Sequence, residues 1–281
     1  MCGIVGGIAE RSITNILIEG LKRLEYRGYD SAGLALINAG QVLRERRVGK
    51  VINLAEAVET SHISGSLGIA HTRWATHGKP TEENAHPHIS GNVAVVHNGI
   101  IENYQELKDD LEALGYIFTS QTDTEVVAHL VNDALKSTPS LLEAVRQVVP
   151  QLKGAYALGI VHTDHPHELI TVREGSPLVI GVGIGENFIS SDQLALLPIT
   201  NRFMYLEEGD IARLTRQTIE IFVNGQLVDR PIKELDATVS NASKGEYKHY
   251  MLKEIYEQPE AIQQTISQAL NGNSLRDDFL N

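Results

Sequence analysis

The sequence contains a single cysteine, Cys2, among 281 residues. One cysteine excludes an internal disulfide framework and fits a reducing compartment, where a free thiol persists. The apolar runs are short, such as Val93 to Val96, so none is long enough to span a bilayer. The first residues also lack a basic stretch followed by an apolar one, which is the pattern of an export signal. These absences predict a soluble, cytoplasmic protein.

Basic residues are in short supply as well. Lys and Arg number 24 against 36 Asp and Glu, which gives a formal net charge of -12. Nucleic-acid backbones and anionic membranes attract clustered Lys and Arg, so this balance argues against both as partners. A small anionic substrate is still compatible, because one buried arginine can bind a carboxylate through two parallel hydrogen bonds. Any arginine that serves a binding site must therefore be individually placed.

The hydrophobic pattern indicates the fold class. Hydrophobic residues make up 42% of the chain, ample for one large domain or two modest ones. Strands are expected at both ends of a helical middle, which predicts an α+β fold, a four-layer αββα sandwich of two antiparallel sheets. The expected strands are 3–9, 34–37, 42–46, 67–71, 93–97, 155–162, 168–173, 178–182, 187–190, 204–206, 211–214 and 219–223. The expected helices are 13–27, 54–58, 104–114, 126–135, one beginning at 140, and 250–270.

Two of these helices begin with a capping pattern. Thr122-Asp-Thr-Glu125 fits a capping box, and Ser140 is followed by Glu143 three residues later. The small and polar stretch from Asp236 to Gly245 predicts a linker between the preceding strands and the final helix.

The position of Cys2 carries a chemical implication. Removal of Met1, which the small side chain of Cys2 permits, leaves an α-amine and a thiol on one residue. A thiol with a pKa of about 8.5 is mostly protonated at neutral pH, whereas an α-amine with a pKa of about 7.7–8.0 can accept a proton. The amine can then activate the sulfur directly or through one water. The alternative is a buried, inert cysteine at the start of a strand.

Two further pairs of residues follow predicted strands. Arg73 could bind a substrate α-carboxylate, with Trp74 covering the site from water. The alternative is a surface arginine beside a core tryptophan. Asn98 and Gly99 could form an oxyanion hole from the side-chain amide and the backbone N–H. The alternative is a type I′ turn, for which Asn-Gly is a strong signal.

Asp123 and a group of histidines complete the candidates. Asp123 is either part of a helix start or a carboxylate left free to bind an α-ammonium group. Five histidines lie near the other candidates: His71, His77, His86, His88 and His97. No carboxylate or cysteine joins them at a recognised metal-binding spacing, so structural hydrogen bonding is the preferred interpretation and no metal is expected.

Six motifs occur in one order in this chain. They are Cys2-Gly-Ile-Val, Arg27-Gly-Tyr-Asp-Ser-Ala-Gly33, His71-Thr-Arg-Trp-Ala-Thr-His-Gly78, Asn84-Ala-His-Pro-His88, Val96-His-Asn-Gly-Ile-Ile-Glu-Asn103 and Thr122-Asp-Thr-Glu125. Together they closely resemble the class II, N-terminal-nucleophile glutamine amidotransferases, and among these the glutaminase domains of glucosamine-6-phosphate synthases. The resemblance implies a glutaminase domain at 1–235, a linker at 236–248, and the start of a sugar isomerase part at 249–281.

The resemblance also implies a role for each candidate. Cys2 would be the nucleophile with its own α-amine as base, and Asn98 with Gly99 would form the oxyanion hole. Arg73 would bind the glutamine carboxylate and Asp123 the glutamine ammonium group. Trp74, Thr76 and His77 would belong to the loop that covers the glutamine. Arg27 would support the surroundings of the nucleophile.

The implied reaction is hydrolysis of L-glutamine to glutamate and ammonia through a γ-glutamyl thioester, without a metal or organic cofactor. In the longer enzymes the ammonia would aminate fructose 6-phosphate to glucosamine 6-phosphate, and the assembly would be a homo-oligomer. The sequence stops at Asn281, before the isomerase domains of the resemblance. We therefore expect this chain to hydrolyse glutamine but not to aminate the sugar. Its own oligomeric state stays open.

Three competing interpretations are weaker. A phosphoribosylpyrophosphate or asparagine-forming amidotransferase would share Cys2 and the oxyanion pair, but the segments 27–33 and 249–259 argue against it. A self-processing hydrolase would place its nucleophile behind a propeptide, whereas only Met1 precedes Cys2 here. A noncatalytic module would have no need to combine the four central candidates, Cys2, Arg73, Asn98 and Asp123.

Overall fold

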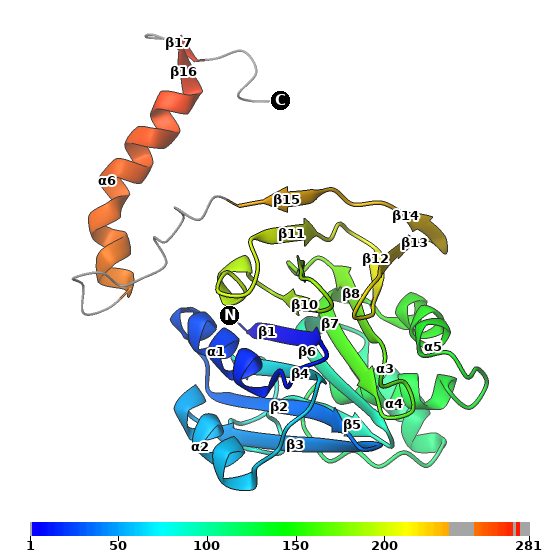
Figure 1. Ribbon diagram of the computed structural model, residues 1–281. Coiled ribbons are helices and arrows are strands. Elements are labelled where there is room, and N and C mark those ends of the chain that lie inside the picture. Colours follow the sequence, from blue (N-terminus) through cyan, green and yellow to red (C-terminus); the bar gives the residue numbers. More distant parts are fainter. Residues whose placement is uncertain (1, 236–249, 272–273, 276–281) are drawn as a thin grey trace. The chain divides into compact units, whose positions relative to one another are not determined.

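The computed structural model describes residues 2–235, 250–271 and 274–275 (Figure 1). The chain divides into two compact units, residues 1–236 and 237–281. All the candidate site residues belong to the first unit.

The described part of the second unit is mainly one helix. Helix α6 (Tyr250–Ala269) confirms the helix predicted there, and the short strands β16 (Leu270–Asn271) and β17 (Ser274–Leu275) follow it. No helix in the described ranges combines the length and apolar character needed to cross a membrane. The expected linker at 236–248 lies outside the described residues, and the start of an isomerase part at 249 stays a prediction.

The first unit is built on an eight-stranded sheet whose neighbouring strands all pair antiparallel. Its strand order is β15-β11-β9-β10-β1-β4-β2-β3. The strands are β1 (Gly3–Ile8), β2 (Ser31–Asn38), β3 (Gln41–Val48), β4 (Leu67–Arg73), β9 (Val179–Val182), β10 (Asn187–Ser190), β11 (Arg202–Tyr205) and β15 (Ile232–Glu234). The strand that begins just after Cys2 is therefore central in its sheet.

A seven-stranded antiparallel sheet packs against the first one. Its order is β14-β13-β12-β8-β7-β6-β5. The strands are β5 (His88–Ser90), β6 (Val93–Ile101), β7 (Gly154–His162), β8 (Leu169–Glu174), β12 (Asp210–Leu214), β13 (Ile219–Val223) and β14 (Gln226–Val228). Strand β6 lies next to the short edge strand β5, so its C-terminal half has a paired neighbour only in β7.

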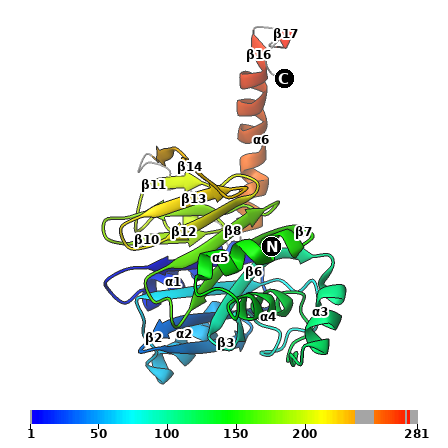
Figure 2. The same cartoon turned by 90° about the vertical axis from the view of Figure 1, so that its right-hand side faces the viewer.

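Helices cover the outer face of each sheet. Helices α1 and α2 lie on one side of the unit and α3, α4 and α5 on the other, with the strands between them (Figures 1 and 2). The helices are α1 (Thr14–Leu24), α2 (Val51–Ser61), α3 (Tyr104–Ala113), α4 (Glu125–Ala134) and α5 (Leu141–Val148), and short 3₁₀ turns occupy Glu25–Arg27, Val149–Gln151 and Gln193–Ala195. The predicted four-layer αββα sandwich is thus confirmed.

Strand alternation explains where the site lies. Successive side chains of a strand point to opposite faces, so Ile4 enters the core between the sheets while Val5 packs toward the helices. Ile69 of β4 and Val96 of β6 also belong to the core between the sheets. On each of these three strands, the residue two positions beyond the apolar one faces the same way and is polar. These polar residues are Cys2 beyond Ile4, His71 beyond Ile69 and Asn98 beyond Val96. The inner layer therefore changes from apolar to polar at one end.

Three details differ from the sequence-based expectations. The strand predicted to close at Asn98-Gly99 runs on to Ile101, and the short strands β5, β14 and β15 were not expected. The predicted capping box at Thr122 to Glu125 is wrong, because helix α4 begins without a side-chain cap. The cap at Ser140 is confirmed, since its hydroxyl accepts a hydrogen bond from the N–H of Glu143.

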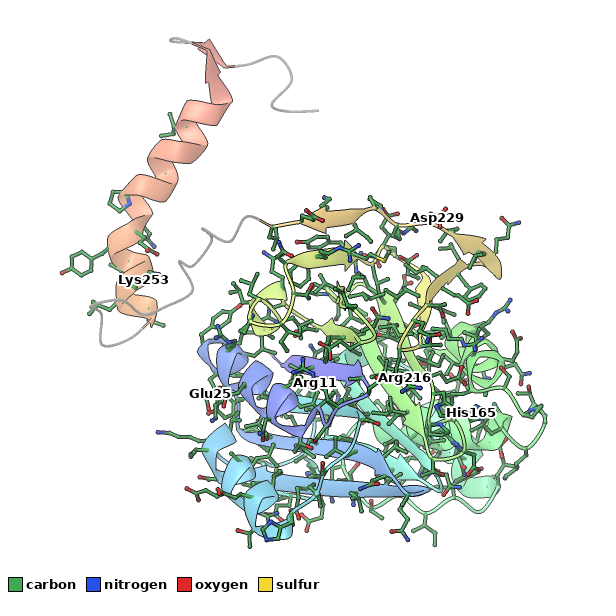
Figure 3. The ribbon with its side chains drawn as sticks, in the orientation of Figure 1. Arg11, Glu25, His165, Arg216, Asp229 and Lys253 are labelled. Carbon is green, nitrogen blue, oxygen red and sulfur yellow. The ribbon has the colours of Figure 1, made fainter. Side chains whose placement is uncertain are left out.

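The surface of the first unit carries charged side chains in ion pairs. Arg11 lies 2.8 Å from Glu186 and Arg216 lies 3.4 Å from Glu10. The two arginines are labelled in Figure 3. Exposed pairs of this kind contribute at most about 1 kcal/mol each. The stability of the fold therefore comes from the buried layers.

Substitution of Phe188 tests this distribution of stability. Phe188 is fully buried in β10, and it packs so closely on β1 that a Cβ atom at Gly7 would lie 2.4 Å from its ring. We expect Phe188→Ala to lower the free energy of unfolding by about 3–5 kcal/mol, because it removes buried apolar surface and leaves a cavity. Urea denaturation measures the change. The matched control is Ile184→Ala, at a side chain that is 96% exposed, and a loss there as large as at Phe188 would contradict the account.

Candidate active site

One small cavity brings most of the candidates together. It is lined by Cys2, Arg73, Trp74, Thr76, His77, His86, His97, Gly99, Thr122, Asp123 and Thr124. These residues come from the start of β1, the end of β4 and the loop after it, strand β6, and the loop before α4. The cavity therefore lies at the polar end of the inner layer.

The Cys2 thiol is held by the backbone of Trp74. Its sulfur accepts a hydrogen bond from the N–H of Trp74 at 3.2 Å and lies 3.5 Å from the Trp74 carbonyl oxygen. Burial raises the pKa of the thiol above its ordinary value, although the N–H of Trp74 acts in the opposite direction. The thiol is therefore protonated at neutral pH, and a base must remove the proton before the sulfur can attack.

Asn98 and Gly99 lie inside strand β6, so the turn interpretation is wrong. The side-chain Nδ2 of Asn98 donates to the carbonyl oxygen of Cys2 at 3.3 Å. Gly99 has a φ of 129°, and a Cβ there would lie 1.9 Å from the Ala155 carbonyl oxygen, so only glycine fits.

The N–H groups beside Gly99 show which edge of the strand faces the cavity. The N–H of His97 donates to Nδ1 of His86, and the N–H of Ile101 donates to Asp123 at 2.8 Å. Backbone N–H groups two residues apart leave a strand on the same edge. Gly99 lies between these two residues and lines the cavity, which places its N–H on that edge too.

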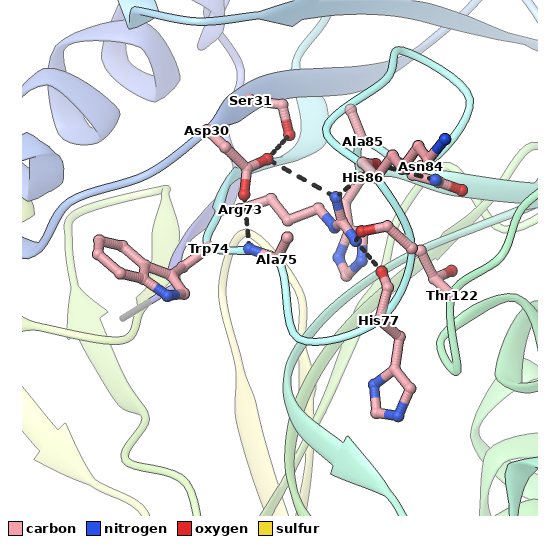
Figure 4. Close-up of polar contacts among 12 residues, drawn as sticks. Asp30, Ser31, Arg73, Trp74, Ala75, His77, Asn84, Ala85, His86 and Thr122 are labelled. Carbon is pink, nitrogen blue, oxygen red and sulfur yellow. Dashed lines mark hydrogen bonds and ion pairs between the residues drawn. The ribbon is translucent and has the colours of Figure 1, made fainter.

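Arg73 is buried, with 3% of its surface exposed, which excludes the surface-arginine interpretation. Its Nη1 lies 3.6 Å from Asp30 and donates to the Lys79 carbonyl oxygen at 3.3 Å. Its Nη2 donates to the carbonyl oxygen of His77, and Figure 4 shows this contact beside the Asp30 pair. The loop that follows β4 is thus wrapped around the guanidinium group.

Asp30 is a site residue that sequence reasoning did not single out. Besides facing Arg73, its carboxylate accepts hydrogen bonds from the N–H of Ala75 at 2.5 Å and from the hydroxyl of Ser31 at 2.8 Å (Figure 4). Its own N–H donates to the Arg73 carbonyl oxygen at 2.7 Å. The available signal was its place in the polar loop from Arg27 to Gly33.

On the loop after β4, Trp74 and Thr76 are exposed and His77 is half-buried. Trp74 is 53% exposed, which excludes a core tryptophan, and its ring lies against Gly28. Figure 4 shows this ring pointing away from the Arg73 guanidinium group. The His77 ring packs edge-on against Tyr104 with 5.3 Å between centroids, and its Nδ1 lies 3.2 Å from the hydroxyl of Thr76.

Asp123 is buried in the lining of the cavity, 3.9 Å from Nδ1 of His97. The loop that carries it is fixed by the carboxylate of Glu125. That carboxylate accepts hydrogen bonds from the N–H and hydroxyl of Thr119 and from the N–H and hydroxyl of Ser120, at 2.7–2.9 Å. Glu125 thus holds the loop before the helix, which is why it forms no capping box.

Four of the five histidines form a buried cluster, two of whose members, His86 and His97, line the cavity: His71, His86, His88 and His97. Burial lowers the pKa of His71 to about 3, and it also lowers the pKa values of the other three, although Asp123 opposes this at His97. All four rings are therefore neutral at pH 7. In the described part of the chain, no group of three or more His, Cys, Asp or Glu side chains is arranged to hold a metal ion.

Two threonines of the 122–125 motif, which the sequence suggested only as part of a helix cap, connect this cluster to the Asp123 loop. The hydroxyl of Thr124 lies 2.9 Å from Nδ1 of His97 and 3.1 Å from Nε2 of His86. The hydroxyl of Thr122 lies 3.0 Å from Nε2 of His88. Both hydroxyls are engaged by histidines, so neither caps helix α4.

Arg27 lies outside the cavity lining. Its Nη2 forms an ion pair with Asp192 at 2.7 Å, and its Nη1 donates to the hydroxyl of Ser191 at 3.4 Å. That hydroxyl accepts a hydrogen bond from the N–H of Ile4 at 3.0 Å. Arg27 therefore braces β1 through Ser191, two residues after Cys2.

Comparison with known proteins defines the class. Residues 71–198 match the glutamine amidotransferase domain family. The fold is similar to that of the glutamine phosphoribosylpyrophosphate amidotransferase from B. subtilis, with a TM-score of 0.68 and 28% identity over 79% of this chain and 49% of that chain. The comparisons thus identify a class II glutamine amidotransferase domain in this chain, as the six motifs predicted.

Within this class, the chain is highly similar in sequence to two curated proteins that share one name. It is 84% identical over 280 residues to the glutamine–fructose-6-phosphate aminotransferase (isomerizing) of Acinetobacter baylyi, covering 100% of this chain and 46% of that protein. The protein of the same name from Pseudomonas putida is 57% identical over 278 residues, 98% of this chain and 46% of the relative. The chain thus spans about half the length of these relatives and corresponds to their glutaminase half.

Acidification tests the role of Glu125. Burial works to raise the pKa of Glu125, but the hydrogen bonds from Ser120 and Thr119 outweigh it and hold the pKa below its ordinary value. The stabilisation is therefore complete above the unfolded pKa of about 4.3 and is lost as the pH falls through the folded pKa. We expect Glu125→Gln to lower the free energy of unfolding at pH 7 by about 1–3 kcal/mol.

Urea denaturation of wild type and Glu125→Gln between pH 7 and pH 3 measures this difference. It should shrink as the pH falls below the unfolded pKa of about 4.3, because the unfolded carboxylate then takes up a proton while the folded one still holds its charge. Glu59→Gln, at an exposed position of α2, is the matched control and should follow wild type throughout. A difference that stays constant down to pH 3 would refute the assignment.

Proposed function

We propose that this site hydrolyses L-glutamine to glutamate and ammonia through a γ-glutamyl thioester on Cys2. The observation that carries the proposal is the meeting, around one cavity, of a thiol, the backbone of Gly99, and two buried groups of opposite charge, Arg73 and Asp123. Glutamine presents a complementary set, because it carries a carboxylate and an ammonium group at one end and an amide at the other.

The α-amine of Cys2 is the proposed base. After removal of Met1 the amine takes the thiol proton, and the sulfur attacks the amide carbon of glutamine. The same proton is then delivered to the leaving nitrogen, which departs as ammonia when the carbon–nitrogen bond breaks. Water attacks the resulting thioester, the carbon–sulfur bond breaks, and glutamate leaves while the sulfur regains a proton. The raised pKa of the Cys2 thiol supports the need for such a base.

Asn98 and Gly99 are the proposed oxyanion hole. In both steps the carbonyl oxygen of the substrate becomes negatively charged, and hydrogen-bond donors fixed around that position stabilise the transition state. The Asn98 amide nitrogen already faces Cys2 at 3.3 Å from its carbonyl oxygen. This arrangement needs no metal or organic cofactor.

The two charged groups fix the substrate's other end. Arg73 offers a forked guanidinium group to the α-carboxylate, and Asp123 offers a carboxylate to the α-ammonium group. Trp74, Thr76 and His77, on the loop wrapped around Arg73, are the proposed cover of the bound glutamine.

The destination of the ammonia is also a proposal. The similar proteins of Acinetobacter baylyi and Pseudomonas putida are named for amination of fructose 6-phosphate. We infer that the ammonia formed here aminates fructose 6-phosphate to glucosamine 6-phosphate when the chain is joined to the other half found in these relatives, in a homo-oligomeric enzyme of the cytoplasm. The chain alone is expected to release free ammonia.

Glutamate release from L-glutamine tests the nucleophile. We expect Cys2→Ala to abolish turnover, and Asn98→Ala to lower kcat by roughly 10²–10³-fold with a smaller effect on KM, because a transition-state donor is lost. Protein that retains Met1 should be inactive until an aminopeptidase removes it. Full activity of protein with intact Met1 would rule out the α-amine as the base.

A substrate analogue tests the role of Asp123. The variant Asp123→Asn keeps an oxygen for the N–H of Ile101 but removes the charge. We expect it to raise KM for L-glutamine by roughly 10–100-fold, since a charge-assisted contact is lost. The matched substrate is glutaramate, which lacks the α-ammonium group and should show nearly the same kcat/KM with variant and wild type. An equal loss with both substrates would contradict the assignment.

A fusion tests the destination of the ammonia. This chain joined to the remaining half of the Acinetobacter baylyi relative should form glucosamine 6-phosphate from glutamine and fructose 6-phosphate, whereas the chain alone should form only glutamate and ammonia. The control is the same fusion with Cys2→Ala, which should lose amination with glutamine. Sugar amination by the chain alone would contradict the proposal that the other half of these relatives is needed for that step.

A further inference from the structure

The side chain of Asn98 lies between two partners that settle its orientation. Its Nδ2 lies 3.3 Å from the carbonyl oxygen of Cys2, and its Oδ1 lies 2.9 Å from Nε2 of His71. A carbonyl oxygen can only accept hydrogen bonds, so the amide nitrogen must be the group that faces Cys2. The amide oxygen then faces His71, and Nε2 of His71 must carry the proton.

His71 is built into the core at this point. It is fully buried on β4, its backbone is paired with Ile4 on one side and Gly33 on the other, and its ring stacks on that of His86 with 4.2 Å between centroids. The neutral ring has one N–H group, and this group donates its hydrogen bond to Oδ1 of Asn98.

The other nitrogen of His71 strengthens this interpretation. Nδ1 is buried and has no hydrogen-bond partner among the described residues. A buried polar atom without a partner is costly, and in native proteins it requires an explanation. If His71 served only to fill the core, an apolar side chain would avoid this cost. A requirement for the Nε2–H group at Asn98 explains why the cost is tolerated.

We propose that His71 is a positioning residue of the oxyanion hole, whose Nε2–H holds the Asn98 amide with its nitrogen toward Cys2. The inference rests on the proposed function, because it matters only if Asn98 donates to the oxyanion. Without the Nε2–H group the amide can turn over and present its oxygen to the reacting centre. An acceptor at that point repels the negative charge that a donor would stabilise.

Two conservative variants separate this role from a merely structural one. In His71→Gln the side-chain NH2 group reaches approximately the position of the histidine Nε2, whereas in His71→Asn it reaches only the position of Nδ1. We expect His71→Asn to lower kcat for glutamine by roughly 10–100-fold, with KM within about threefold of wild type, and His71→Gln to restore kcat to within about fivefold. If His71→Asn does not fold, His71→Leu takes its place as the variant without a donor.

A double-mutant cycle with Asn98→Ala identifies the route of the effect. Because the amide is already absent in Asn98→Ala, adding His71→Asn should slow that variant by no more than about twofold. Alkylation of Cys2 by iodoacetamide provides a second readout, since displacement of iodide forms no oxyanion. Its rate should be the same in wild type and His71→Asn.

The outcomes are distinct. The inference is overturned if His71→Asn turns over glutamine like wild type, if Gln rescues no better than Asn, if the loss is equally large in the Asn98→Ala background, or if alkylation slows in parallel with turnover. Cys2→Ala is measured alongside. If Cys2→Ala still hydrolyses glutamine, the proposed function itself fails, whereas its inactivity together with fully active His71 variants refutes only the positioning role.

Discussion

The antiparallel pairing of β1 with β4 is the constraint on which the site depends. It sets Gly3 opposite Thr72, so that Cys2 lies beside the end of β4, where the backbone of Trp74 holds its sulfur. The same register puts His71 and Arg73 on the inner face of the sheet, two and four residues beyond the apolar Ile69. A slip of one residue would turn every one of these side chains toward the helices.

The second sheet supplies the complementary half of the site from an equally rigid strand. Strand β6 delivers Val96 to the apolar core and then Asn98 to the polar end of the same face. Its free edge offers N–H groups to His86 and Asp123, because β5 ends before reaching that part of the strand. The positions of Asn98 and Gly99 are thus fixed by a strand of the second sheet, whereas Trp74, Thr76 and His77 lie on the loop after β4.

Sequence reasoning reached the fold and the candidate residues by different routes. The sandwich followed from the periodicity of strands at both ends of the chain, and the family followed from six ordered motifs. The strand through Asn98-Gly99 was misjudged, because Asn-Gly is an ordinary turn signal and the close contact with Ala155 that demands glycine is a tertiary feature. The capping box at Thr122 failed for the same reason, since histidines far away in sequence engage the threonine hydroxyls. The role of Asp30 was likewise not visible, because its partner Arg73 is 43 positions away in the sequence.

The central claim is that Cys2 reacts through its sulfur as the first residue of the mature chain. The most direct measurement is acid quenching of the protein during turnover of L-glutamine, followed by mass analysis of the N-terminal peptide. The account predicts a peptide that begins at Cys2 and carries one γ-glutamyl group on its sulfur. Steady glutamate release with that peptide unmodified, or with the group on another residue, would contradict it.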